Sequence, residues 1–196
     1  MKYNFLYFLF IVLLFYSCSY KDREYNLEFQ NDYLEWMPDE STTEMVYSDT
    51  NGNTIVYQLN YYDDGTNLVY IDGDEGVNYY YFGKWKSINY SNTEDENPIL
   101  EYTYYIAYQY ERQVDMLNVQ YGSFSMKIAI PDEAYYIEDN YSDYSNYLFA
   151  DTMQINGQMF ESVYYRESLS GDVGIYYKKN TIIAFKSGSG TYLIKQ

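Results

Sequence analysis

Residue types that commonly carry enzyme chemistry are scarce in this chain. It contains one cysteine, Cys18, and no histidine. The absence of histidine excludes Ser-His-acid and Cys-His nucleophile systems and removes the commonest ligand of zinc, copper and iron. Carboxylate pairs, Ser-Lys arrangements and calcium binding are therefore the ordinary chemical routes that remain.

The 29 acidic residues do not single out a site. The paired carboxylates of a glycosidase lie roughly 5 to 10 Å apart, and so many acids offer too many pairs to choose from. Three segments rich in Asp and Asn, residues 49–53, 72–75 and 139–143, lack the EF-hand pattern. Their composition is typical of turns. We predict no catalytic residue, no metal site and no cofactor.

Cys18 follows a segment with the three parts of an export signal. Lys2 supplies a positive start, residues 5–16 form an unbroken apolar run, and the small Ser17 precedes the cysteine. A helix that spans a membrane needs about 20 apolar residues, so the run is short for an anchor. We predict a lipoprotein signal, with an uncleaved anchor or an ordinary signal peptide as alternatives.

Residues 14–18, Leu-Phe-Tyr-Ser-Cys, resemble the lipobox of bacterial lipoproteins. The resemblance implies that Cys18 is diacylated and becomes the new N-terminus, and two acyl chains give stable anchoring to a membrane. In lipoproteins of the Bacteroidetes kind, acids just after the cysteine mark export to the outer face, and Asp22 and Glu24 lie there. The implied location is the outer membrane of the cell envelope, on its periplasmic or surface face. The implied division is a signal peptide, a lipidated tether and a single β domain, at residues 1–17, 18–32 and 33–196.

Thr152 is a second candidate for modification. Asp151-Thr152-Met153 matches the short acceptor pattern seen for O-linked glycans on exported Bacteroidetes proteins. The same three residues also fit the ordinary start of a strand. Thr152 is therefore a candidate O-glycosylation site with a purely structural alternative.

The charge of the chain excludes one class of partner. The formal net charge is −17, and removal of residues 1–17 takes away one base, Lys2. Nucleic-acid binding needs a basic surface, which this composition does not supply. We expect no nucleic acid partner and a soluble, monomeric domain held to the membrane by lipid.

The fold class follows from alternation of apolar and polar residues with a period of two. Residues 101–111 alternate aromatic and polar side chains, which predicts a half-buried strand, and we expect residues 123–130 to be its partner. Asn51-Gly52 and Asn156-Gly157 are typical of tight hairpin turns. Further turns are predicted at residues 63–65 and 72–76, a loop with room for a short helix at 132–149, and strands at 174–178, 181–186 and 191–195. The prediction is an all-β antiparallel meander of about eight to ten strands, closing into a lipocalin-like barrel or a two-sheet sandwich.

Tyrosine is the most unusual component, at 31 of 196 residues. Tyrosine fills strands well, and it also makes recognition surfaces, so both roles are open. The stretches INGQMFESVYYRE and VGIYYKKNTIIAFKSGSGTYLI resemble the C-terminal parts of small Bacteroidetes envelope lipoproteins, which implies an envelope β domain without known active residues. We expect a non-enzymatic binding or structural module for a glycan, a peptide or an apolar ligand. The alternatives are a carboxylate-based hydrolase and a subunit or inhibitor in an envelope complex.

Overall fold

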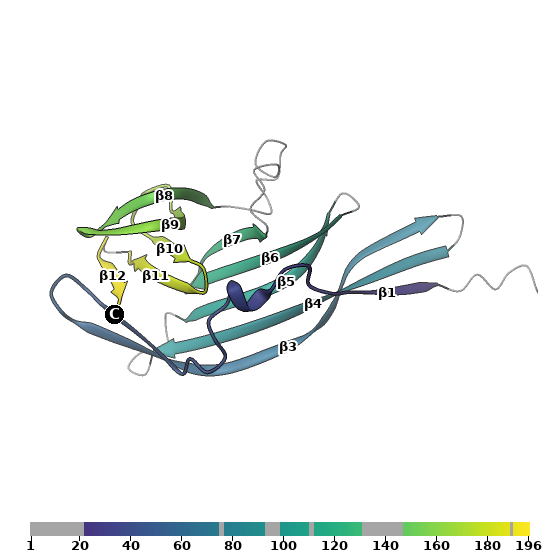
Figure 1. The fold of residues 1–196 in the computed structure, drawn as a ribbon, viewed down its shortest axis with the longest axis horizontal. Helices are drawn as coiled ribbons and strands as arrows, with labels where there is room; N and C mark the ends of the chain where they lie inside the picture. Colours follow the sequence, from purple (N-terminus) through teal and green to yellow (C-terminus); the bar gives the residue numbers. More distant parts are fainter. Residues whose placement is uncertain (1–21, 75–76, 93–98, 110–111, 131–146, 189) are drawn as a thin grey trace, which may run out of the picture.

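The computed structural model describes residues 22–74, 77–92, 99–109, 112–130, 147–188 and 190–196 (Figure 1). Within them, no helix is long and apolar enough to cross a membrane. The elements are β1 (Arg23–Leu27), the 3-10 helix η1 (Tyr33–Glu35), β2 (Glu44–Ser48), β3 (Thr54–Asp74), β4 (Val77–Asn92), β5 (Leu100–Gln109), β6 (Arg112–Tyr121), β7 (Phe124–Ile130), β8 (Leu148–Ile155), β9 (Gln158–Glu167), β10 (Gly174–Lys178), β11 (Thr181–Lys186) and β12 (Tyr192–Lys195).

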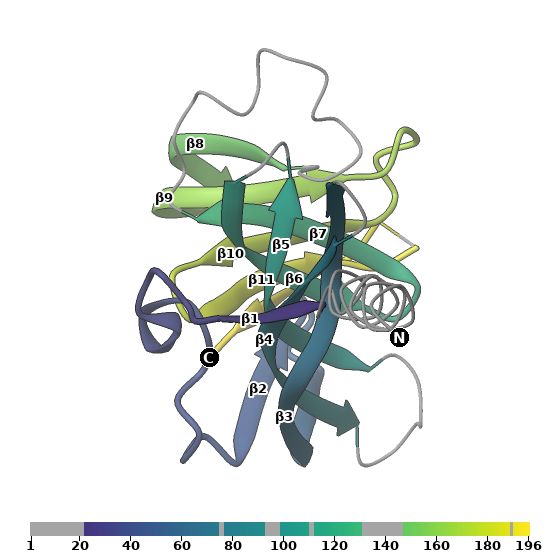
Figure 2. The same ribbon diagram turned by 90° about the vertical axis from the view of Figure 1, so that its right-hand side faces the viewer.

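All the strands belong to one sheet in the order β7-β6-β5-β4-β3-β2-β12-β11-β10-β9-β8, and β1 adds to β4 in parallel. The other pairings are antiparallel, which confirms the predicted all-β meander. The sheet curls into a half-barrel, so that its two ends pack face to face (Figure 2). Among the described residues, no pairing joins β7 to β8.

The predicted Asn-Gly hairpins are confirmed. Asn156 and Gly157 have φ angles of 47° and 84°, the positive values that a tight two-residue turn requires. At the first hairpin Gly52 has a φ of 82°, and the Asp49 carboxylate accepts hydrogen bonds from the backbone N–H groups of Asn51 and Asn53 at 2.8 Å. Asp49 therefore caps its own turn.

The turn predicted at residues 63–65 is wrong, because β3 runs through it without interruption. Gly65 pairs with Trp85 of β4, and a Cβ atom on Gly65 would lie 3.0 Å from the indole nitrogen of Trp85. The glycine makes room for a large cross-strand side chain. Beside it, Asp64 pairs with Lys86.

The partner predicted for residues 101–111 is also wrong. β6 lies between β5 and β7, so residues 123–130 pair with β6. The sequence of β6 shows no alternation of apolar and polar residues, because Val114, Asp115, Met116 and Leu117 are all buried. Both faces of β6 are covered at this point.

The described part of the segment predicted as a tether, residues 22–32, contains a strand. Arg23–Leu27 is strand β1, and it pairs with residues 79–83 of β4. The pairing is possible because β5 leaves β4 after the Trp85–Tyr105 pair, which opens that edge of β4. Most of the loop predicted at residues 132–149 lies outside the described residues, and β8 begins at Leu148.

Many tyrosines form the core between the two ends of the sheet. Tyr47, Tyr57, Tyr90, Tyr102 and Tyr177 are buried there. Hydroxyl groups bond within this core: Tyr47 donates to the Ile182 carbonyl at 3.0 Å, and Tyr102 accepts from the Ile182 N–H at 3.2 Å. Because buried polar groups cost free energy when unpaired, these bonds are what allow tyrosine to replace phenylalanine in a core.

Candidate functional site

A second set of tyrosines lies outside this core, at the end of the molecule where β3 and β4 project beyond the other strands (Figure 1). Five rings from four strands form one continuous set of ring contacts, which we call the tyrosine row: Tyr25 of β1, Tyr79 and Tyr81 of β4, Tyr70 of β3 and Tyr108 of β5. Tyr81 is central, with its ring centroid 5.1 Å from Tyr25, 5.7 Å from Tyr70 and 4.8 Å from Tyr108. Tyr25 also stacks on Tyr79, at 6.3 Å.

The pairing of the strands explains why these rings meet. Tyr25 pairs with Tyr81, and Tyr81 pairs with Tyr70, which places the three side chains on one face of the sheet. After it leaves β4, β5 passes close to the same face. A Cβ atom on Gly83 would lie only 2.9 Å from the Cβ atom of Ile106 on β5. Gly83 therefore permits the close approach that sets Tyr108 over Tyr81.

The tyrosine row remains partly accessible to solvent. Tyr25 is 39% exposed, and the other four rings are half-buried. The planes of Tyr25 and Tyr81 lie within 16° of parallel, and those of Tyr81 and Tyr108 within 17°. Stacked rings cover one another's faces, so their edges and hydroxyl groups are what a ligand can reach.

The hydroxyl group of Tyr81 is neutral at physiological pH. Desolvation raises the pKa of Tyr81, and the neighbouring Tyr108 and Tyr25 raise it further. A neutral phenol both donates and accepts hydrogen bonds. The tyrosine row therefore offers hydrogen-bonding groups on a rigid aromatic support.

A hollow of about 420 Å³ lies where β5 separates from β4. Its lining includes Asn67, Lys84, Trp85, Tyr105 and Ile106. This volume is in the range of small-ligand sites, roughly 300 to 1,000 Å³. The hollow shares Gly83 and Ile106 with the region under the tyrosine row.

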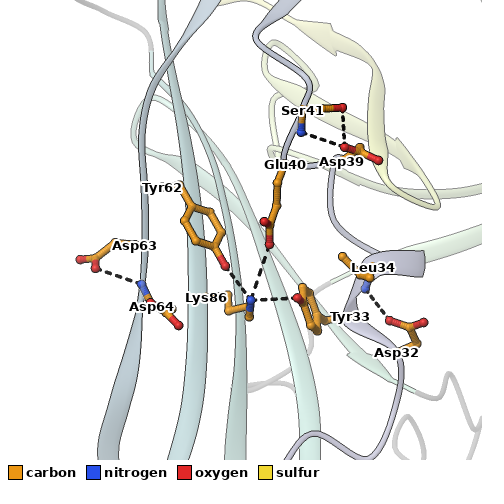
Figure 3. Close-up of polar contacts among 10 residues, drawn as sticks. All are labelled: Asp32, Tyr33, Leu34, Asp39, Glu40, Ser41, Tyr62, Asp63, Asp64 and Lys86. Atoms are coloured by element: carbon orange, nitrogen blue, oxygen red, sulfur yellow. Dashed lines mark hydrogen bonds and ion pairs between the residues drawn. The ribbon is translucent and has the colours of Figure 1, made fainter.

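Lys86 forms a separate polar cluster, in which its amine joins three segments (Figure 3). Nζ donates to the hydroxyl groups of Tyr33 at 2.8 Å and Tyr62 at 2.6 Å, and it lies 3.6 Å from Oε1 of Glu40. Nζ also lies over the Tyr33 ring, 4.2 Å from its centroid. The cluster fastens η1 and the residues that follow it to β3 and β4.

The charge state of Lys86 favours this structural role over a role as a nucleophile or a general base. Burial acts to lower the pKa of the amine, but the hydrogen bonds to Tyr33 and Tyr62 outweigh it and raise the pKa above its usual value. The amine is therefore protonated at neutral pH. A protonated amine has no lone pair with which to attack a substrate or accept a proton.

Asp115 is the most deeply buried charged residue of the described chain, at 0% exposure. Its Oδ2 accepts hydrogen bonds from the backbone N–H groups of Gln30 and Asn31, both at 2.8 Å, and from Nδ2 of Asn31 at 3.1 Å. The Tyr104 hydroxyl group donates at 3.3 Å. Asp115 thus ties the segment after β1 to β6.

The residues predicted as sites are not brought together by the structure. Cys18 lies outside the described residues. Thr152 lies on β8, opposite Glu161, with an exposed side chain, and its modification stays a prediction. Within the described ranges, no group of three or more Asp, Glu or Cys side chains is arranged to hold a metal ion.

Some carboxyl groups have perturbed pKa values, but in the direction opposite to that of a general acid. Hydrogen bonds within their own turns lower the pKa of Asp39 and of Asp49. A general acid needs a raised pKa. These two carboxylates are therefore turn caps.

Sequence reasoning did not single out Lys86, Asp115 or the five members of the tyrosine row. An Asp between apolar residues, in the run Val114-Asp115-Met116-Leu117, is the one local signal that could have been followed. The row depends on the departure of β5 from β4, which no local pattern encodes.

Comparison of the chain with protein-family models, with curated proteins and with solved structures finds no match.

Proposed function

We propose that the chain is a lipid-anchored protein of the cell envelope whose β domain is a non-enzymatic binding or structural module. Cys18 is the proposed attachment point, because the only cysteine of the chain ends an export signal and a lipobox-like stretch. The proposed location is the outer membrane, on its periplasmic or surface face.

The observation that carries the binding role is the tyrosine row. A protein that used tyrosine only to fill its core would bury its rings, as Tyr47 and Tyr102 are buried. The row instead keeps five contacting rings partly accessible on a strand support. Rigid tyrosines lose little conformational entropy when they bind, which is why they are common in recognition surfaces.

The orientation of the rings favours a ligand rich in hydrogen-bonding groups. Sugar rings and peptide backbones carry many such groups, whereas a purely apolar ligand would leave the tyrosine hydroxyl groups unpaired. A glycan or an extended peptide therefore fits the row better than a purely apolar ligand, although the hollow beside it, lined in part by Trp85 and Ile106, offers apolar surface.

The binding role is tested on glycan and peptide arrays with the full-length protein extracted from membranes. Tyr81→Phe and Tyr108→Phe remove hydroxyl groups but keep the stack, and Tyr61→Phe is the control because Tyr61 is 46% exposed and lies outside the row. We expect the first two variants to weaken binding severalfold and the control to leave it unchanged. Absence of binding, or binding that ignores the row variants, would contradict the proposal.

The lipid attachment is tested by mass spectrometry of the same membrane extract. We expect a mature chain that begins at a diacylated Cys18, and we expect Cys18→Ala to abolish that modification. An unmodified chain that begins at Met1, or a Cys18→Ala protein still held as firmly in the membrane, would refute the attachment.

A further inference from the structure

The projecting end of the molecule is a three-stranded ribbon with apolar side chains on both faces. The ribbon consists of β1, residues 68–74 of β3 and residues 77–83 of β4. One face carries four rings of the tyrosine row. The opposite face carries two directly paired apolar couples of β3 and β4, Leu68 with Phe82 and Ile71 with Tyr80, which we call the apolar face, and β1 borders it with the polar Glu24 and Asn26.

The apolar face is open to solvent in the isolated chain. Ile71 is 52% exposed and Leu68 is 46% exposed, while Tyr80 and Phe82 are half-buried. Contiguous exposed apolar residues on a soluble protein mark an interaction surface. The apolar face is therefore a candidate interaction surface.

The length of chain before β1 points to the occupant. Cys18 precedes Arg23 by five residues, and a chain spans at most about 3.6 Å per residue, so Cys18 lies within about 18 Å of Arg23. Arg23 pairs with Tyr79, inside the ribbon. Lipid on Cys18 would thus hold the ribbon at the bilayer, whereas β8 to β12 lie at the other end of the molecule (Figure 1).

The chemistry of the apolar face suits the boundary between lipid headgroups and acyl chains. Tyrosine and tryptophan concentrate at this boundary, and the transfer of leucine and isoleucine side chains into it is favourable. Charges on and near the ribbon set the kind of lipid, because Glu24 lies on the apolar face beside Tyr80, and Arg23 and Asp72 lie on the opposite face beside Tyr79. Asp22, Glu24 and Asp72 outnumber Arg23 and Lys84, which disfavours an anionic bilayer.

We propose that the apolar face of the ribbon is a membrane-contact surface that seats on a zwitterionic lipid bilayer beside the anchored Cys18. The inference rests on the lipid attachment proposed above. It deepens that proposal by orienting the domain, because the ribbon face that carries the tyrosine row is then turned away from the bilayer and stays available to a ligand.

The test uses the full-length lipidated protein reconstituted into vesicles of phosphatidylcholine and phosphatidylethanolamine. Cys18 is the only cysteine and is consumed by lipid, so Ile71→Cys introduces a single free thiol for a polarity-sensitive fluorophore. Leu148→Cys is the matched control, because Leu148 is 60% exposed but lies on β8. The readouts are quenching by spin-labelled lipid and quenching by aqueous iodide.

We expect the label at position 71 to be quenched severalfold more by spin-labelled lipid than the label at 148, and to be shielded from iodide. Replacing part of the lipid with phosphatidylglycerol should reduce this lipid quenching at low ionic strength.

Equal iodide quenching at both positions, in protein that floats with the vesicles, overturns the seating and leaves the lipid attachment intact. Shielding of the label at position 71 from iodide that grows with protein density, without quenching by spin-labelled lipid, means that a second copy of the protein covers the apolar face. This result also overturns the seating on the bilayer. Protein that does not float with the vesicles refutes the attachment itself.

Discussion

Tyr108 stacks on Tyr81 with ring centroids 4.8 Å apart, although the regular pairing of their strands ends at Trp85 and Tyr105. The contact is made through the face of the sheet. It holds the end of β5 against the projecting hairpin after backbone hydrogen bonding between β5 and β4 has stopped.

Removal of the central ring should therefore loosen the projecting end. Tyr81→Ala loses ring contacts to Tyr25, Tyr70 and Tyr108. Each aromatic pair contributes about 0.5 to 1.5 kcal/mol, so for three pairs we expect the free energy of unfolding to fall by roughly 1.5 to 4.5 kcal/mol. Urea denaturation measures this, with Tyr61→Ala as a control expected to change it by less than about 0.5 kcal/mol. Equal effects of the two substitutions would contradict a stabilising role for the stack.

Replacement of Asp115 should release the segment after β1. Asp115→Ala leaves the N–H groups of Gln30 and Asn31 without their carboxylate acceptor. Hydrogen bonds to a charged group contribute about 1.5 to 3 kcal/mol, and we expect a loss of that order or more. Asp115→Asn keeps one acceptor oxygen and should cost less. Hydrogen exchange at residues 30 and 31 is the direct measurement, and unchanged protection in Asp115→Ala would exclude the anchoring role.

The buried tyrosines should make the protein sensitive to alkali. Desolvation, with a contribution from Asp39, raises the pKa of Tyr90 from 10.0 to about 12. A group whose pKa is higher in the folded state stabilises the fold fully below its unfolded pKa, and that stability is lost as pH rises through the folded value. We expect the free energy of unfolding to fall between about pH 10 and pH 12.

Denaturation at several pH values, with tyrosinate absorbance recorded alongside, checks this dependence. Tyr90→Phe should make the decline less steep, because one titrating group is removed. At neutral pH the same substitution loses the hydrogen bond to the Thr42 carbonyl, at 3.0 Å, and should cost about 1 kcal/mol. A decline that is equally steep in Tyr90→Phe would rule out Tyr90 as a contributor.

Lys86 should be a slow target for amine-directed reagents. Its raised pKa reduces the fraction of free amine at any given pH. Competitive acylation followed by mass spectrometry should show Lys86 reacting severalfold more slowly than the exposed Lys178. The double substitution Tyr33→Phe and Tyr62→Phe removes both hydroxyl acceptors and should bring the two rates closer. Similar rates in the parent protein would show that the cluster does not hold the amine.

The sequence predicted those parts of the fold that local chemistry determines. Asn156-Gly157 requires positive φ angles, and the alternation of Tyr102, Tyr104 and Ile106 requires a strand with one buried face. It did not predict β6, because a strand covered on both faces has no period to detect. It misread Gly65, because the same residue type serves a turn and the close approach of Trp85.

The candidate site was less accessible to sequence reasoning than the fold. An abundance of tyrosine indicated that some rings could form a surface, but not which ones. Tyr102 and Tyr108 belong to the same alternating strand, yet one is buried in the core and the other joins the tyrosine row. The difference arises where β5 turns away from β4 and crosses the face of the sheet at Gly83, a tertiary event that no local pattern encodes.

The parallel pairing of β1 with β4 also constrains the order of folding. The β3–β4 hairpin closes through neighbouring residues, whereas β1 reaches β4 across a long intervening chain: the Asn78 N–H donates to Asp22 at 3.2 Å over 56 positions. Closing a long loop costs more entropy than closing a hairpin, so we expect β1 to dock after the hairpin exists. The processing of the N-terminal segment proposed above would then act on a chain whose β1 is still undocked.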